Sequence, residues 1–160
     1  MKTNKHNPPQ KRSRFRQGYY VLTNPEKYIG DLGEIIYRSS WEKRLFEFCD
    51  NRSSILKWSS EPFAIKYFDE SSMKSRRYFP DAYIEVIDVD GSIKKYLIEV
   101  KPYKQTLEPK KGKKKSKTYI TECATYTKNQ SKWKFAREFC ERNGMEFMII
   151  TEKELGLPSR

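Results

Sequence analysis

Three charged residues in the middle of the chain have the types and the spacing for metal-assisted hydrolysis. Asp81 follows Pro80 in the run YFPDAYIEVI, and Glu99 and Lys101 lie in the run YLIEVK. Both runs are rich in β-branched and aromatic residues, so both carboxylates are expected inside a sheet. Burying an unpaired carboxylate is costly, which predicts a compensating partner for each of them.

A divalent cation is the partner that two such carboxylates favour. Mg²⁺ and Mn²⁺ prefer hard oxygen ligands, so Asp81 and Glu99 are predicted metal ligands, joined by the carbonyl oxygen of Val100. The cation would lower the pKa of the attacking water and neutralise a phosphate, while Lys101 would orient that water or stabilise the developing charge. The predicted chemistry is phosphodiester hydrolysis without a covalent enzyme intermediate.

Lys101 also has a simpler interpretation. It would pair with Glu99 or Asp81 at a strand end, as many exposed charges do, and contribute roughly 0 to 1 kcal/mol. The Glu-Val-Lys triplet alone favours this ion pair. Its combination with Pro80-Asp81, an intervening hairpin and a strongly basic composition favours the catalytic interpretation.

A β-hairpin is the element that must bring these groups together. The runs YFPDAYIEVI and IKKYLIEVK are joined by DVDGS, in which Asp90-Gly91 is a favoured tight-turn pair. Side chains alternate along a strand, so Asp81 shares one face of the first strand with Phe79, Tyr83 and Glu85. Glu99 and Lys101 share one face of the second strand with Leu97, so three ionisable groups can converge.

The remaining elements complete a mixed α/β plan. A helix is predicted over about residues 40–51, because Trp41, Leu45, Phe48 and Cys49 recur at helical spacing and Ser39 with Glu42 forms a capping box. Strands are predicted in ILKW and PFAIKYF, a loop in DESSMKSRR, a second helix over 131–144, and a buried, central strand in MEFMII. We therefore expect one domain with a mixed sheet and flanking helices.

The charge balance points to a polyanionic partner. Lys and Arg number 33 against 21 for Asp and Glu, a net charge of +12, which makes nucleic acid the first candidate. No apolar run approaches the ~20 residues of a spanning helix, and no signal peptide follows Met1, so a soluble intracellular protein is expected. Three cysteines and one histidine support neither a disulfide framework nor a zinc site. An RNA-binding module of ribosomal type would share this charge, but it would not explain the acidic residues.

Two basic segments are expected to be mobile when no ligand is bound. Residues 1–18 read as a flexible arm, residues 19–160 as the folded domain, and residues from about 104 to 118 as a lysine-rich loop within it. Contacts to DNA phosphates, with little base specificity, are predicted for eleven basic residues: Arg12, Arg14, Arg16, Arg76, Arg77, Lys110, Lys111, Lys113, Lys114, Lys115 and Lys132.

Pro80-Asp81 followed by Glu99-Val100-Lys101 resembles the signature of the PD-(D/E)xK nucleases. YRSSWEKRLFEFCD, SSEPF, RRYFPD, YLIEVKP and YTKNQSKW together look like the tailed-phage head-completion nucleases and the related endonuclease subunit of heteromeric transposases. The similarity covers roughly residues 37 to 150. It implies a restriction-endonuclease-like fold and places Glu42, Asp81, Glu99 and Lys101 on the family's acidic and lysine positions. Glu42 thus has two interpretations, a helix cap and a catalytic acid.

The resemblance also implies a function. It predicts a Mg²⁺- or Mn²⁺-dependent DNA endonuclease that acts on DNA ends or on the packaged genome during phage head completion. Head, portal or neck proteins are the implied partners, and the host cytoplasm or the virion is the implied location. The alternative is a non-catalytic DNA-binding structural protein of the phage head or neck, which would bind DNA without a metal and without cleaving it.

Overall fold

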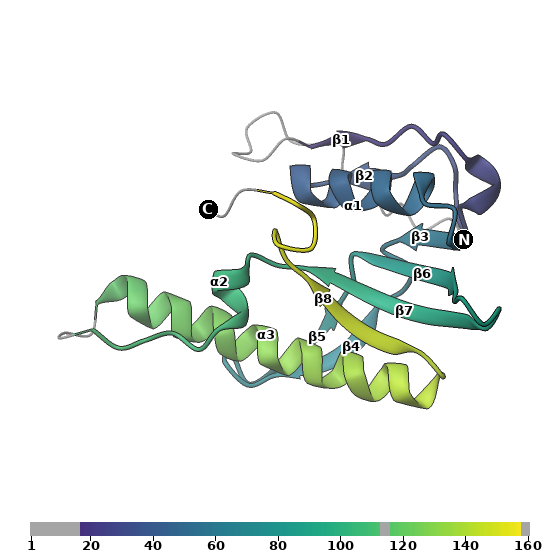
Figure 1. Cartoon of the computed structure of the whole chain (residues 1–160). Coiled ribbons are helices and arrows are strands. Elements are labelled where there is room, and N and C mark those ends of the chain that lie inside the picture. The colour runs from purple at the N-terminus through teal and green to yellow at the C-terminus, as the bar shows by residue number, and fades with distance from the viewer. Residues whose placement is uncertain (1–16, 113–115, 158–160) are drawn as a thin grey trace.

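A four-stranded mixed sheet forms the centre of the molecule (Figure 1). The computed structural model describes residues 17–112 and 116–157. The strand order is β3-β6-β7-β8, in which β3, β6 and β7 are antiparallel neighbours and β8 runs parallel to β7. These strands span Ile55–Ser60, Ala82–Ile87, Ile93–Val100 and Glu146–Ile150. The mixed sheet with flanking helices confirms the predicted fold class.

The predicted hairpin is β6–β7. Ala82 pairs with Ile98 and Tyr83 with Leu97, a register that sets Asp81 opposite Glu99. The turn follows the expected chemistry, because Gly91 has a φ of 83° and its N–H donates to the carbonyl of Asp88 over 3.0 Å.

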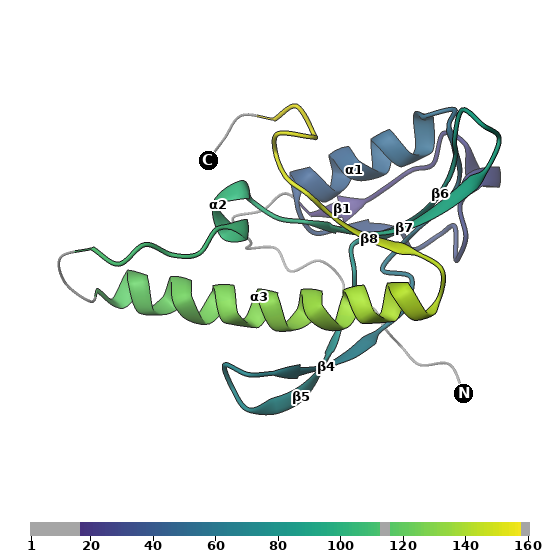
Figure 2. The same cartoon turned by 60° about the horizontal axis from the view of Figure 1, so that its bottom comes forward.

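The two faces of the sheet are covered by different elements. The helix α1 (Ser40–Asn51) packs on one face, while α3 (Lys117–Arg142) and the hairpin of β4 (Ile65–Asp69) and β5 (Lys74–Tyr78) lie side by side on the other (Figure 2). Shorter elements flank this arrangement: β1 (Gly18–Tyr19), β2 (Ile36–Tyr37), the 3-10 turn Pro25–Lys27 and α2 (Tyr103–Thr106). Alternation along β7 turns Ile98 and Val100 toward α1, and Leu97 and Glu99 toward α3.

The helix α1 begins as predicted, but its buried face contains Phe46 and Asp50 and not Phe48. Ser39 caps it by accepting a hydrogen bond from the backbone N–H of Glu42. Phe46 is buried, whereas Phe48 is 47% exposed and lies under the guanidinium of Arg52. The prediction that Phe48 faces the core is therefore wrong, because Phe46 packs between α1 and the sheet in its place.

The segment DESSMKSRR is not the predicted loop. Its first residue ends β4, and its last four residues belong to β5, which pairs with β4 in a separate two-stranded sheet. The turn is held by Asp69, whose carboxylate accepts hydrogen bonds from the hydroxyls of Ser71 and Ser72 over 2.6 and 2.7 Å. Only Tyr78 of β5 is buried, so the strand has no apolar alternation by which the sequence could reveal it.

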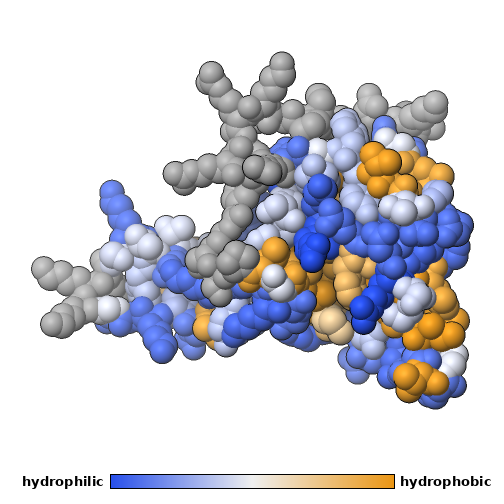
Figure 3. Space-filling view, turned by 45° about the horizontal axis from the view of Figure 1, so that its top comes forward, coloured by the Kyte–Doolittle hydropathy of each residue, from blue (hydrophilic) through white to orange (hydrophobic). Residues whose placement is uncertain are grey.

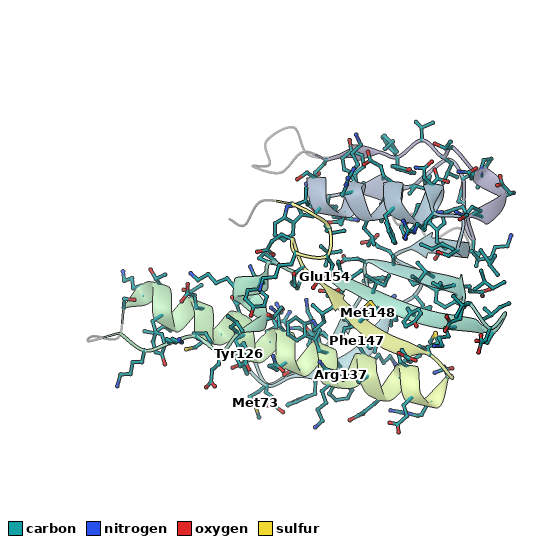
Figure 4. The ribbon with its side chains drawn as sticks, in the orientation of Figure 1. Met73, Tyr126, Arg137, Phe147, Met148 and Glu154 are labelled. Carbon is teal, nitrogen blue, oxygen red and sulfur yellow. The ribbon has the colours of Figure 1, made fainter. Side chains whose placement is uncertain are left out.

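The last strand, β8, lies at the edge of the sheet and not at its centre. It pairs only with β7 among the described strands, and none of its five residues is fully buried. The prediction of a buried central strand is wrong, because an apolar run does not specify how many neighbours a strand has. Phe147 packs against α3, where the guanidinium of Arg137 lies 5.6 Å from its ring centroid (Figure 4).

The second long helix starts 14 residues earlier than predicted. Ser116 caps α3, which continues for 26 residues and stops before Gly144, whose φ is 63°. Its first turns are mostly exposed and extend beyond the sheet (Figure 1). They therefore have no apolar stripe from which the sequence could predict a helix. The segment from about 104 to 118, predicted as a loop, includes most of α2 and the first two residues of α3.

One face of the molecule is largely polar (Figure 3). Figure 3 shows a mainly hydrophilic face on which the apolar side chains form separate patches. Within residues 17–112 and 116–157, no helix is long and apolar enough to cross a membrane. Most of the predicted basic arm, residues 1–16, lies outside the described residues.

Candidate active site

Asp81 is fixed in the short connection between β5 and β6. The buried Pro80 precedes it. The backbone carbonyl of Asp81 accepts a hydrogen bond from the N–H of Glu61 over 3.2 Å. Its carboxylate reaches across to β7, where Oδ2 accepts the backbone N–H of Val100 over 2.7 Å. The Asp81 carboxyl group is therefore held at the end of β7, beside Glu99.

Glu99 is buried and has two side-chain partners. Only 2% of its surface is exposed. Its Oε2 accepts the hydroxyl of Tyr78 over 2.7 Å, and its Oε1 lies 2.8 Å from the ammonium of Lys101. Tyr78 comes from β5, so the β4–β5 hairpin helps to fix the carboxylate. Tyr78 was missed because the sequence placed it at the start of the hairpin strand YFPDAYIEVI and not in a strand that pairs with β4.

The pKa of Asp81 reflects the acidic groups that the strand register places around it. Burial and then the neighbouring Glu99 carboxylate raise the pKa of Asp81 well above its usual range, with a further contribution from Glu42. Lys101 and the N–H of Val100 oppose this shift only in part. Burial would lower the pKa of Lys101, but the carboxylates of Glu99 and Asp81 raise it overall. Asp81, Glu99 and Lys101 thus form one interacting group, as the sequence predicted.

Glu42 fulfils its capping role and also acts on this group. Its carboxylate accepts hydrogen bonds from the N–H of Arg38 over 2.8 Å and from the hydroxyl of Ser39 over 3.0 Å. Burial raises the pKa of Glu42, and both hydrogen bonds oppose the rise. Since its charge also contributes to the raised pKa of Asp81 and Lys101, Glu42 lies close enough to influence the site.

The donor set fits a divalent cation. Asp81 and Glu99 offer hard carboxylate oxygens, and their mutual repulsion is the kind of unfavourable charge that a cation relieves. Among the residues that the structure describes, no three acidic, histidine or cysteine side chains form a compact ligand cluster. A cation here would therefore be held by these two carboxylates with backbone or solvent oxygens, and the carbonyl of Val100 remains a predicted ligand. Its N–H is already bonded to Asp81.

The predicted DNA-binding residues fall in different environments. Arg76 pairs with Asp69 over 3.0 Å, and Arg77 lies 5.3 Å from the ring centroid of Phe79. Lys110 and Lys111 are exposed. Lys132 lies over the ring of Tyr78, beside the acidic group. The other predicted contacts lie outside the described residues: Arg12, Arg14, Arg16, Lys113, Lys114 and Lys115.

Replacing Tyr78 with phenylalanine is expected to destabilise the fold by about 1.5–3 kcal/mol, because the buried Glu99 loses a hydrogen bond to a charged group. The ring, and hence the packing, is preserved. Urea unfolding followed by circular dichroism measures the change. Tyr83→Phe is the matched control, because the hydroxyl of the partly buried Tyr83 bonds the half-buried Glu85. Its loss should destabilise the fold less. Equal effects would contradict the special role of Tyr78.

Comparison with known proteins agrees with this geometry. The family described as "TnsA-like endonuclease N terminal" matches residues 52–152, a range that includes Asp81, Glu99 and Lys101. The "Head completion nuclease" of Enterobacteria phage T4 is 39% identical over 142 residues, which cover 86% of this chain and 92% of the relative. The chain therefore belongs to the family of nucleases with a TnsA-like endonuclease N-terminal domain, of the PD-(D/E)xK type.

Proposed function

We propose that this protein is a Mg²⁺- or Mn²⁺-dependent endonuclease that hydrolyses DNA during the completion of phage heads. The main support is the convergence of Asp81, Glu99 and Lys101 at one end of β7. The family supplies the reaction class, and the name of the phage T4 relative suggests the stage of assembly. The protein's proposed location is the host cytoplasm, and its proposed substrate is DNA ends or the packaged genome. The proposed partners are head or neck proteins.

The protein's own groups divide the reaction between them. A bound divalent cation would lower the pKa of the attacking water and neutralise the phosphate. Asp81 and Glu99 would hold it, with Val100 as a backbone ligand. Lys101, fixed by Glu99 over 2.8 Å, would orient the water or stabilise the negative charge that develops on the phosphate. Tyr78 keeps Glu99 in place, and Glu42 adds negative charge at the edge of the site.

The basic residues outside this centre would hold the DNA backbone. Arg77, Lys110 and Lys111 are proposed to contact phosphates, as are the predicted residues outside the described ranges. Arg76 is a weaker candidate, because it already pairs with the buried Asp69. Such contacts give affinity that falls with salt and carries little sequence information.

The test is cleavage of a supercoiled plasmid and of a branched duplex in Mg²⁺, in Mn²⁺ and with a chelator. Nicking that requires the metal supports the proposal, and the two substrates show whether branched DNA is preferred. DNA that is bound but stays intact in every metal would overturn the nuclease and favour the structural DNA-binding alternative.

Two neighbouring substitutions separate the capping role of Glu42 from a catalytic one. Glu42→Gln keeps a side chain that can cap the helix but removes the charge, so stability should change by less than about 1 kcal/mol. Cleavage is expected to fall about tenfold or more, as for the loss of one electrostatic group. Ser39→Ala should do the reverse, costing about 1 kcal/mol of stability with nearly normal cleavage.

Thermal unfolding and plasmid nicking, measured on both variants at equal folded fractions, decide between the two roles. Full activity in Glu42→Gln would leave Glu42 as a helix cap alone.

A further inference from the structure

Lys132 lies beside the candidate active site but comes from a different element, α3. Its ammonium is 5.4 Å from the centroid of the Tyr78 ring. The hydroxyl of that same ring bonds Glu99, which in turn pairs with Lys101. Lys101, directly after β7, thus pairs with the Glu99 carboxylate, and Lys132, from α3, lies over the ring of the tyrosine that bonds the same carboxylate.

The packing of α3 fixes where Lys132 is placed. Ala136 and Cys140, one and two turns further along the helix, are buried in the core with Leu97 and Tyr78. Ser131 is also buried, and its hydroxyl donates to the carbonyl of Thr127 over 3.1 Å. Lys132 is itself half-buried, so its stem has little freedom to swing into solvent.

The surroundings of Lys132 compensate its positive charge only in part. Burial and then the ammonium of Lys101 lower the pKa of Lys132, and Lys128 on the same helix acts in the same direction. The carboxylates of Glu99 and Asp81 oppose the shift without cancelling it. Across residues 17–112 and 116–157, no carboxylate lies within ion-pair distance of its ammonium.

We propose that Lys132 is a second catalytic lysine, whose ammonium binds a non-bridging oxygen of the phosphate under attack from the α3 side while Lys101 acts from β7. This inference rests on the proposed nuclease function. Holding two ammonium groups near each other in a partly buried site is unfavourable in the free protein. An anionic phosphate between them would offset that cost, which favours a phosphate as the missing partner.

The role of Lys132 in the reaction is electrostatic. The water oxygen forms a bond to phosphorus, one ester P–O bond breaks, the water gives a proton to solvent, and the departing oxygen takes one up. Negative charge gathers on the non-bridging oxygens as this happens. Lys132 stays protonated throughout and stabilises that charge, so it contributes more to the rate than to the binding of uncleaved DNA.

Lys132→Met tests this role, with Lys134→Met as the matched control, because Lys134 is an exposed lysine on the same helix. The rate at saturating DNA is expected to fall about 100-fold in Lys132→Met, as when one preorganised donor is lost. Its Kd for DNA, measured with chelator, should change only about threefold, as for one phosphate contact. Lys134→Met should match the wild type, and Lys132→Arg should recover most of the rate because it restores the positive charge.

Two results would overturn the inference while the nuclease stands. One is an unchanged rate at saturating DNA with weaker binding, which makes Lys132 an ordinary backbone contact. The other is an equal rate loss in Lys132→Arg together with a lower unfolding midpoint in both variants, which makes its role structural. Wild-type protein that does not cleave at all would instead overturn the proposed function, and this role with it.

Discussion

Replacing Asp81 with asparagine is expected to reduce DNA cleavage by at least about 100-fold while making the fold more stable. The loss of activity follows because the substitution removes one of the two carboxylates that would hold the cation. The amide oxygen of asparagine can still accept the N–H of Val100, which Asp81 now binds over 2.7 Å. The local structure should therefore survive.

The gain in stability follows from the raised pKa of Asp81. The folded protein holds the Asp81 proton more tightly than the unfolded chain, because burial and Glu99 disfavour the charged form. The contribution of the Asp81 carboxyl group to the stability of the fold is fully present below its unfolded pKa of about 3.9. It is lost as the pH rises through the raised pKa of the folded state. Above the unfolded pKa the wild type must fold either with a disfavoured charge on Asp81 or by taking up a proton, and the variant avoids this cost.

Thermal unfolding at several pH values, with and without Mg²⁺, measures both effects. The Tm of Asp81→Asn should exceed that of the wild type at pH 7 by a few degrees, and the gap should narrow toward pH 4. Mg²⁺ should raise the Tm of the wild type far more than that of the variant. Asp90→Asn is the control, because it makes the same exchange in the exposed hairpin turn and keeps a favoured turn pair. Normal cleavage by Asp81→Asn would show that the Asp81 carboxylate is not part of the active site.

The centre of this site was predictable because local rules place its parts. Alternation along two strands and an Asp90-Gly91 turn suffice to set Asp81 opposite Glu99, and the register of β6 and β7 confirms it. The cap around Ser39 and Glu42 is equally local: the Ser39 hydroxyl accepts the N–H of Glu42 and donates to its carboxylate. That carboxylate also accepts the backbone N–H of Arg38, one residue before the Ser39 N–H that a capping box uses. Where an interaction spans only a hairpin or one helical turn, the sequence pattern determines it.

The parts that the sequence did not reveal depend on tertiary pairing. Tyr78 reaches Glu99 only because β5 folds back on β4, and β5 has no alternating pattern of its own. Lys132 reaches Tyr78 only because α3 packs beside that hairpin. The edge position of β8 likewise follows from which strand it pairs with, which an apolar run cannot specify. The placement of Asp81 opposite Glu99 was therefore predictable, whereas the contacts that Tyr78 and Lys132 make around them were not.

Replacing Lys101 with methionine is expected to reduce cleavage by at least about 100-fold, as Asp81→Asn does, but to destabilise the fold. The buried Glu99 would lose its ion pair with Lys101, which is now 2.8 Å long. Removing one partner of a fully buried pair costs about 3–5 kcal/mol, and since the Lys101 side chain is 23% exposed, a smaller loss of about 1–3 kcal/mol is expected. The raised pKa of Lys101 means that this stabilisation is fully present at neutral pH and is lost only as the pH rises through the folded value.

Urea unfolding and plasmid nicking at equal folded fractions distinguish catalysis from simple ion pairing at Lys101. Lys95→Met is the control, because Lys95 is an exposed lysine on β7, the strand that Lys101 directly follows. A stability loss with normal cleavage would reduce Lys101 to the ion pair that Glu-Val-Lys alone suggests. Two variants that both lose cleavage, while one gains stability and the other loses it, are not explained by a common loss of the fold. That opposite pair of stability changes would place the chemistry in the Asp81, Glu99 and Lys101 group itself.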